Sequence, residues 1–225
     1  MILDSGNNVI YEKNVEGVVG IFELRPDTQL GRTHLQESHL SGRVARLSNL
    51  SLWTAIGTSV IRQVIRAGHA RKMYETFCRE YGDHILINSE ITYYFFPSPE
   101  KCLEISDDEF AKLGMSFKKK ALRCVAEAYI NNKNAWIKMD GDTLIRELMG
   151  VKQIGDWTAR ATTADWTNDW SFYPHSDLAI RTYARKILPL IEWHDDPSSF
   201  SEQWRGLAQD QLSSLTLLTI ARGGS

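Results

Sequence analysis

The chain has 225 residues, of which 43 % are hydrophobic and 24 % are charged, with only 6 Pro and 15 Gly. Such a length and composition are typical of one compact domain, or of one domain with an appendage, and they exclude disordered, collagen-like and low-complexity chains. The net charge is −2, so a generally basic nucleic-acid coat is absent, although a basic patch on one face stays compatible with this total.

The three cysteines, Cys78, Cys102 and Cys124, lie far apart and show no CxxC spacing. We predict that they are reduced core thiols, and neither an iron–sulfur set nor a disulfide framework. Residues 1–4 lack the start of a signal peptide, and no segment approaches the ~20 apolar residues that span a bilayer. These patterns predict a soluble cytoplasmic protein with no membrane partner.

Residues 1–48 differ from the rest because they contain a β-branched stretch at 15–24 followed by Pro26. They predict an extended or hairpin-like lead-in. From Ser51 onward the apolar residues recur at helical spacing, first over 52–67 and then over 73–81, where Gly82 ends the pattern. The aromatic segment 91–96 is compatible with a buried turn or a short strand.

The second half of the chain predicts further short helices. One begins after Ser106 and ends at Gly114, and another begins at Ser116, with Lys118, Lys119 and Lys120 expected on a solvated face. Later helices are predicted over 142–151, 156–166, 178–188 and 200–221. The predicted fold class is therefore mostly α, with a short extended or β lead-in.

The helices at 142–151 and 156–166 are separated by only four residues, 152–155, which predicts a helical hairpin. Main-chain N–H groups from Gly155 onward would then face outward at the positive end of the second helix, where they can bind an anion without any lysine. From spacing alone, a plain tight helical turn is the favoured interpretation.

Two sequence segments favour an anion-binding hairpin over a plain tight turn. VKQIGDWTA at 151–159 resembles the helix-hairpin-helix signature of the DNA glycosylase superfamily, and YPHSDLAIR at 173–181 resembles its catalytic segment. Asp177 follows Ala159 by eighteen positions, the interval of the alkylbase (3-methyladenine glycosylase II-like) branch. Further matches stand in the same order along the chain as in the family. They are FPSPE (96–100), LGMS (113–116) with KKA (119–121), and Trp204, Arg205 and Ala208.

The resemblance implies a two-lobed glycosylase fold over 49–225, with 1–48 as a separate lead-in segment. It also implies an enzyme of base excision repair that flips a damaged base out of the duplex and hydrolyses its N-glycosidic bond. Asp177 would be the catalytic carboxylate, because bond cleavage builds positive charge on the sugar that an ionised carboxylate stabilises. The alternative is that Asp177 only caps the helix that follows.

Trp157 separates two mechanisms. Members that also cut the backbone need an amine nucleophile, and one branch has a lysine at this position. Trp157 therefore favours a monofunctional enzyme without lyase activity.

The sequence also departs from the signature, because Lys152 replaces its proline and Gln153 its first glycine, so the turn lacks the residue best suited to φ > 0. Ala161 stands where alkylbase-type members carry a pocket aromatic, which affects substrate choice.

The remaining expected site residues fall into two groups. For the base pocket we expect Trp157, Trp53, Tyr173 and His175, although tryptophans are more often core residues and His175 is equally suited to capping a turn. For DNA contact the resemblance implies Gln63, Lys152, Gln153, Gly155 and Thr158. Gln63 matches a glutamine that faces the gap in the DNA, and the alternative is a plain exposed polar residue.

No required cofactor is expected, since HExxH, paired metal-binding histidines and Gly-rich nucleotide loops are absent. The resemblance implies a monovalent cation, K⁺ or Na⁺, held by the main-chain carbonyls of Met149, Val151 and Ile154. The expected partner is double-stranded DNA with a damaged base, bound by a monomer, on the nucleoid if the source is bacterial.

Three functions follow from these patterns. The first is a monofunctional glycosylase for alkylated purines, whose cationic bases are already good leaving groups. The second is a glycosylase for another modified or mismatched base, favoured by Ala161 and Gln153. The third is a non-catalytic DNA-binding module that keeps the hairpin.

Overall fold

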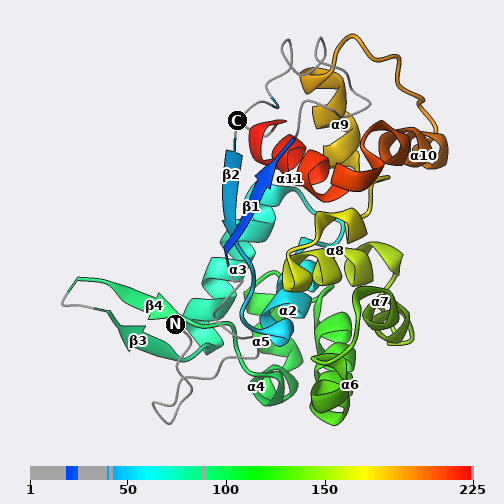
Figure 1. The fold of residues 1–225 in the computed structure, drawn as a ribbon. Helices are drawn as coiled ribbons and strands as arrows, with labels where there is room; N and C mark the ends of the chain where they lie inside the picture. The colour runs from blue at the N-terminus through cyan, green and yellow to red at the C-terminus, as the bar shows by residue number, and fades with distance from the viewer. Residues whose placement is uncertain (1–18, 25–39, 41–42, 88–89, 224–225) are drawn as a thin grey trace. The chain divides into compact units, whose positions relative to one another are not determined.

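The computed structural model describes residues 19–24, 40, 43–87 and 90–223. The described chain is mostly helical with a short N-terminal strand hairpin, which confirms the predicted fold class (Figure 1). It forms two compact units, which we describe separately. Unit 1 comprises Met1–Val15 and Asn49–Thr162, and unit 2 comprises Glu16–Ser48 and Thr163–Ser225.

The described part of the N-terminal segment is a two-stranded antiparallel ribbon. Strand β1 (Val19–Glu23) pairs with β2 (Arg43–Leu47), with Val19 opposite Leu47. Helix α11 (Leu212–Gly223) packs against β1 within unit 2. The hairpin-like prediction is thus confirmed for these strands, and the other residues before Arg43, apart from Leu24 and Leu40, lie outside the described residues.

Unit 1 is built from short helices whose ends follow local signals. Ser51 caps α2 (Leu52–Arg62) by accepting a hydrogen bond from the Thr54 N–H, and α3 (Ala67–Tyr81) ends at Gly82 as predicted. The further helices are α4 (Pro99–Glu104), α5 (Asp107–Lys112), α6 (Lys119–Trp136), α7 (Gly141–Met149) and α8 (Asp156–Thr167), the last of which continues into unit 2.

An aromatic cluster forms the core of unit 1. Phe77 and Phe96 lie 5.5 Å apart between ring centroids, and Trp53 packs on both Phe96 and Tyr129. Trp53 is only 5 % exposed, and its indole N–H donates to the Pro97 carbonyl at 2.7 Å. Burial of rings with such edge contacts is a main stabilising term. Trp53, which we expected in the base pocket, is therefore a core residue here.

Unit 2 contains α9 (Leu178–Ile187), α10 (Pro197–Leu207) and α11, with short 3₁₀ turns η1 (Trp170–Phe172) and η2 (Gln209–Gln211). The single helix predicted over 200–221 is wrong, because the backbone leaves the helical region at Ala208 (φ −154°). The Trp204 indole N–H donates to Thr216 across this break at 3.1 Å. Both helices bury an apolar face, so the periodicity alone reads as one helix.

The lysine run also departs from its prediction. Helix α6 begins at Lys119 and not at Ser116, and Phe117 is 59 % exposed. Lys118 is only 1 % exposed, because its amine donates hydrogen bonds to the carbonyls of Val60 and Gln63 at the end of α2. Thus Lys118 is a buried residue that links the start of α6 to the end of α2, and the solvated face expected for the three lysines is not continuous.

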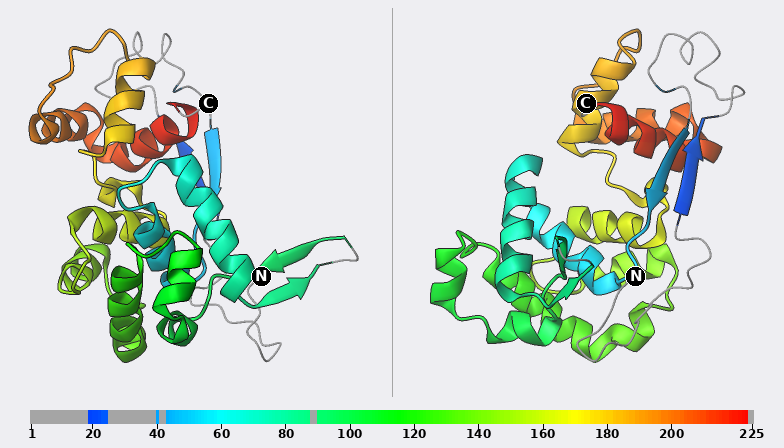
Figure 2. Two further views of the ribbon diagram at one scale, coloured as in Figure 1. Left: turned by 180° about the vertical axis from the view of Figure 1, so that it is seen from behind. Right: turned by 90° about the vertical axis from the view of Figure 1, so that its left-hand side faces the viewer.

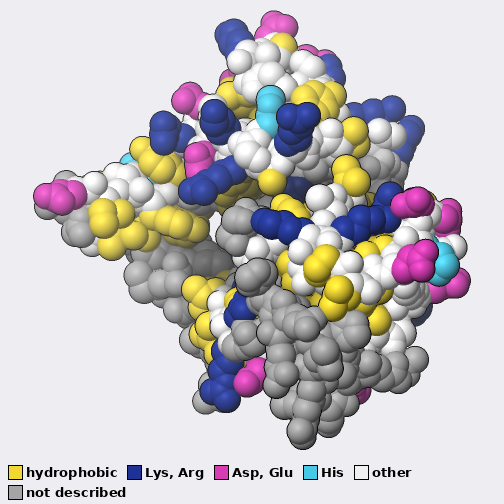
Figure 3. All heavy atoms as spheres, turned by 90° about the horizontal axis from the view of Figure 1, so that it is seen from above, with side chains coloured by type: hydrophobic (Ala, Val, Ile, Leu, Met, Phe, Trp, Pro, Cys, Tyr) yellow, Lys and Arg dark blue, Asp and Glu magenta, His cyan; other side chains and the backbone are white. Residues whose placement is uncertain are grey.

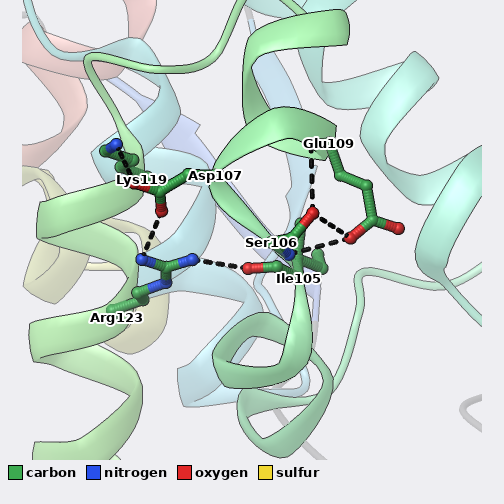
Figure 4. A network of polar contacts seen from close by, with 6 residues as sticks. All are labelled: Ile105, Ser106, Asp107, Glu109, Lys119 and Arg123. Atoms are coloured by element: carbon green, nitrogen blue, oxygen red, sulfur yellow. Dashed lines mark hydrogen bonds and ion pairs between the residues drawn. The ribbon is translucent and has the colours of Figure 1, made fainter.

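Helices α5 and α6 are joined by a polar network (Figure 4). Asp107 pairs with Lys119 and with Arg123, the latter at 2.7 Å, and the second guanidinium nitrogen of Arg123 donates to the Ile105 carbonyl. Ser106 and Glu109 cap each other's main-chain N–H groups at the start of α5. This capping box stabilises the helix start that the sequence predicts after Ser106.

A hairpin of β3 (His84–Leu86) and β4 (Thr92–Tyr94) projects from the rest of unit 1 (Figures 1 and 2). Hydrophobic side chains cover much of it (Figure 3), and Leu86, Ile87, Ile91 and Tyr93 are each at least 49 % exposed. The segment 91–96 is thus a short strand and not a buried turn. No described helix is long and apolar enough to span a membrane.

Candidate functional site

The predicted helical hairpin is present in unit 1. Asp140 caps α7, and the chain turns between Met149 and Asp156 into α8. The turn is closed by hydrogen bonds from the Val151 N–H to Leu148 and from the Ile154 N–H to Val151, both 3.0 Å. Two short helices are therefore joined as the spacing predicts.

Gln153 has φ = +74° within this connection. The sequence predicted that a residue other than glycine must adopt the left-handed conformation here, and the structure confirms it at this position. A side chain with a Cβ atom loses roughly 1–2 kcal/mol in this region of φ and ψ. The hairpin therefore contains a local strain that glycine would not have.

The start of α8 is open on its outer side. Gly155 is exposed, and a Cβ atom added there would meet nothing within 4 Å. Lys152 and Gln153 are also exposed, whereas Thr158 is buried. A phosphate can thus approach the main-chain N–H groups at the positive end of this helix, which is the geometry of an anion site.

The end of α2 contacts the hairpin. The Gln63 amide nitrogen donates to the Thr158 hydroxyl at 2.7 Å and to the Gln153 carbonyl at 3.4 Å. The Arg62 guanidinium lies 5.7 Å from the centre of the Trp157 ring, within range of a cation–π contact. Gln63, Gln153, Thr158 and Trp157 are thus brought together as predicted site residues, while direct DNA contact by Gln63 stays a prediction.

Val64 follows Gln63 in the turn between α2 and α3, so the continuous helix predicted over 52–67 is wrong here, and Val64 was not predicted as a site residue. It has φ = +60° and is fully exposed. A β-branched residue in this conformation is an outlier, and such strain concentrates at functional sites. Nothing in the local sequence predicts it, because Gln63-Val64 has no turn signature.

Lys118 lies directly behind this turn. Burial lowers the pKa of its amine from the usual value to about 8. Its hydrogen bonds to two carbonyls at the end of α2 fix the main chain that presents Gln63 and Val64.

A cavity of about 260 Å³ lies between α2 and α3, with Ile61, Ala67 and Ala70 among its walls. Arg62 and Arg71 also border it. Its lining includes none of the four residues expected in the base pocket, so it is not the predicted pocket.

The segment 173–181, which the resemblance implies to be catalytic, lies in unit 2. Asp177 is the N-cap of α9, and its carboxylate accepts a hydrogen bond from the Ala179 N–H at 2.8 Å. Asp177 is half-buried, and this hydrogen bond shows that the capping role predicted as the alternative is present.

Three residues shortly before Asp177, at 173–175, are buried, whereas Ser176 is exposed. Tyr173 is 3 % exposed and stacks on Trp170 at 5.2 Å, and the Arg46 guanidinium lies over the other ring of this pair, Trp170. His175 is 2 % exposed, and its Nδ1 accepts a hydrogen bond from Arg205 Nε at 3.4 Å. Because an arginine can only donate, Nδ1 of His175 is the acceptor in this contact.

The expected cation ligands, the carbonyls of Met149, Val151 and Ile154, all belong to the hairpin turn. The Val151 carbonyl accepts the Ile154 N–H, which leaves one lone pair for a ligand. Main-chain oxygens suit hard cations, so the donors present fit K⁺ or Na⁺. Among the described residues, no group of three or more His, Cys, Asp or Glu side chains is arranged to hold a metal ion.

No protein-family model matches the sequence, and no curated protein matches it either. Solved structures do. A 3-methyladenine DNA glycosylase from Archaeoglobus fulgidus is 21 % identical with a TM-score of 0.65, and the match covers 84 % of this chain and 64 % of that one. A DNA-3-methyladenine glycosidase from Bacillus halodurans is 17 % identical with a TM-score of 0.61, and the match covers 92 % and 93 %.

A third match is an 8-oxoguanine glycosylase/lyase from Clostridium acetobutylicum in complex with double-stranded DNA. It is 15 % identical with a TM-score of 0.59, and the match covers 78 % of this chain and 61 % of that one. The chain thus spans less than two thirds of the length of the Archaeoglobus and Clostridium proteins. These likenesses show that the chain has the fold of helix-hairpin-helix DNA glycosylases.

Proposed function

We propose that the protein is a monofunctional DNA glycosylase that hydrolyses the N-glycosidic bond of an alkylated purine. The observation that carries the proposal is Asp177, a half-buried carboxylate at the N-terminus of α9 in a chain with the glycosylase fold. A carboxylate beside the anomeric carbon would stabilise the positive charge that develops on the sugar, and it would orient the attacking water.

The hairpin would hold the DNA backbone. The exposed N–H groups near Gly155 would bind a phosphate, with Lys152 beside them. A contact of this kind carries no sequence information, which suits an enzyme that finds damage at any position. A cation held by the carbonyls of the turn would add positive charge at the same place.

Val64 would fill the space that a flipped nucleotide leaves. Proteins that kink or open a duplex often insert an apolar side chain between base steps. Val64 has a strained backbone and an apolar side chain that is fully exposed to solvent. It directly follows Gln63, which contacts the hairpin. Its insertion would hold the damaged base outside the stack.

Two features support hydrolysis without backbone cleavage, although one structural neighbour is a glycosylase/lyase. A lyase needs an accessible amine nucleophile. Trp157 occupies the position at which one lyase branch has lysine. The pKa of Lys118 is lowered to about 8, but its amine is buried and donates to two carbonyls, so no sugar aldehyde could reach it.

The substrate class rests on the alkylbase-like interval between the hairpin and Asp177. Purines alkylated at N3 or N7 are cationic and leave readily, so one carboxylate suffices for them. Ala161 is buried and supplies no aromatic ring to a pocket, which keeps a glycosylase for another modified base as the second candidate.

The test is release of free base from duplex DNA. We expect the wild-type protein to release 3-methyladenine or 7-methylguanine from methylated duplex, and the Asp177→Asn variant to release neither. A panel of oligonucleotides with single lesions separates the two enzyme candidates. Tight binding to an abasic-site analogue without release of any base would instead support the DNA-binding module.

A further inference from the structure

The hairpin connection depends on a side chain from outside the hairpin. Gln153 occupies the left-handed region without being glycine, so the connection does not gain its conformation from its own residue. A contact from outside the connection must therefore stabilise the left-handed conformation at Gln153, because a residue with a Cβ atom has lower energy in other turn conformations. The contacts of Gln63 are placed to do this.

The Gln63 amide bridges the two sides of the connection. Its nitrogen donates to the Gln153 carbonyl, just before the turn into α8, and to the Thr158 hydroxyl, one turn inside that helix. Because a main-chain carbonyl can only accept, the group facing Gln153 must be the amide nitrogen. Gly155, whose N–H is the proposed phosphate contact, lies between these two anchors.

Gln63 is itself held in place. Lys118 donates to the Gln63 carbonyl and to the Val60 carbonyl, and it is almost fully buried. The support therefore runs from α6 to the end of α2 and from there to the hairpin, entirely within unit 1.

We propose that Gln63 is a positioning residue that holds the Gln153 connection in its left-handed conformation, and so replaces the glycine that this turn lacks. The proposal rests on the proposed function for its DNA readout alone. Both amide hydrogens of Gln63 are used inside the protein, so its effect on DNA is exerted through the placement of the Gly155 N–H.

The experiment is a double-mutant cycle with Gln63→Ala, Gln153→Gly and the double variant. The probe is a duplex that contains a tetrahydrofuran abasic-site analogue, bound at fixed salt and at a temperature where circular dichroism shows all variants folded. We expect Gln63→Ala to weaken binding about tenfold, and Gln153→Gly to restore most of that loss in the double variant, because glycine adopts the turn unaided.

Two outcomes would overturn the proposal. If Gln153→Gly restores nothing, Gln63 contacts DNA directly. If Gln63→Ala binds like the wild type, the connection needs no support. Gln203→Ala is the matched control, since Gln203 also donates to a main-chain carbonyl, that of Glu192, in unit 2. Any loss of DNA binding or stability that Gln203→Ala causes should not be restored by Gln153→Gly.

Thermal unfolding of the free protein separates this proposal from the proposed function. Gln63→Ala should lower the melting temperature, and Gln153→Gly should restore it in the same cycle. If the wild type failed to prefer the abasic duplex, the glycosylase proposal would fail, while the unfolding cycle would still decide the role of Gln63.

Discussion

The two segments proposed to act on DNA are stabilised in different ways. The connection at Gln153 is strained and is held by side chains from distant parts of the sequence, Gln63 and behind it Lys118. The segment from Tyr173 to Asp177 contains no positive φ, and its end is fixed by the local cap between Asp177 and the Ala179 N–H. The conformation of the Gln153 connection thus depends on tertiary contacts, whereas the position of the Asp177 carboxylate depends mainly on its own helix.

The largest expected effect tests the local side of this comparison. Asp177→Asn should lower the rate of base release by about 10²–10⁴-fold, because it removes the charge. Asparagine caps a helix as well as aspartate does, so the melting temperature should stay unchanged. Base release resolved by chromatography, together with thermal unfolding, measures both.

Asp196→Asn is the control for this prediction, because Asp196 also caps a helix, α10, where its carboxylate accepts from the Ser199 N–H. That variant should keep both stability and activity. Equal release by Asp177→Asn and the wild type would sink the proposed mechanism, and Asp177 would be a cap alone.

The next effect tests the distant support. Lys118→Met should destabilise the protein by about 1–3 kcal/mol, because two buried carbonyls lose their donor. Lys120→Met, an exposed neighbour, serves as the control. If Lys118→Met lowers the free energy of unfolding no more than Lys120→Met does, the hydrogen bonds of Lys118 do not stabilise the fold.

The same pair gives a pH dependence. The folded pKa of Lys118 is about 8, below the unfolded value of about 10.4, so unfolding takes up a proton between these values. The free energy of unfolding of the wild type should therefore increase relative to that of Lys118→Met as the pH rises from 8 toward 10. Urea unfolding at pH 7, 8 and 9 measures the difference, and a flat difference contradicts burial of a titrating amine.

A smaller effect is expected at Val64. Val64→Gly should raise stability by about 0.5–1 kcal/mol, since relief of left-handed strain exceeds the entropy cost of glycine. The same change should weaken binding to abasic duplex about tenfold, through loss of the apolar wedge. Opposite signs in the two measurements are the signature, and a loss of stability would show that the strain is absent.

The smallest effect is expected at the surface network of Figure 4. Hydrogen bonds from Lys119 and Arg123 hold the pKa of Asp107 below its usual value, so the pair stabilises the fold at neutral pH and is lost as the carboxylate protonates in acid. Asp107→Asn should lower the melting temperature slightly at pH 7, and this difference from the wild type should shrink as the pH falls through the lowered pKa of Asp107. An effect independent of pH would show that charge is not its cause.

Local signals explain what the sequence could predict. Ser51, Ser106 and Asp177 each cap the helix that follows, and each acts within three residues of its own position. The left-handed turn at Gln153 was predictable as well, because the signature has glycine there. Spacing could not predict the break at Ala208, because an apolar face continues on both sides of it. Nor could it predict the burial of Lys118, which depends on carbonyls distant in the sequence.

The predicted site residues divide in the same way. The hairpin residues and Trp157 lie together because they share one short stretch of chain. Trp53 is a core residue because its partners Pro97 and Tyr129 come from other elements. Val64 was missed because exposure and backbone strain have no sequence pattern in this turn.

The burial of two thiols has a consequence for chemical survival. Burial raises the pKa of Cys78 to about 11 and that of Cys102 to about 12. Thiolates, not thiols, react with electrophiles, and at pH 7 only about one Cys78 in 10⁴ is ionised. The agents that methylate purines in DNA are electrophiles of this kind. We therefore expect both residues to stay unmodified under an exposure that damages the genome, so that the protein keeps its core intact when alkylated bases become abundant.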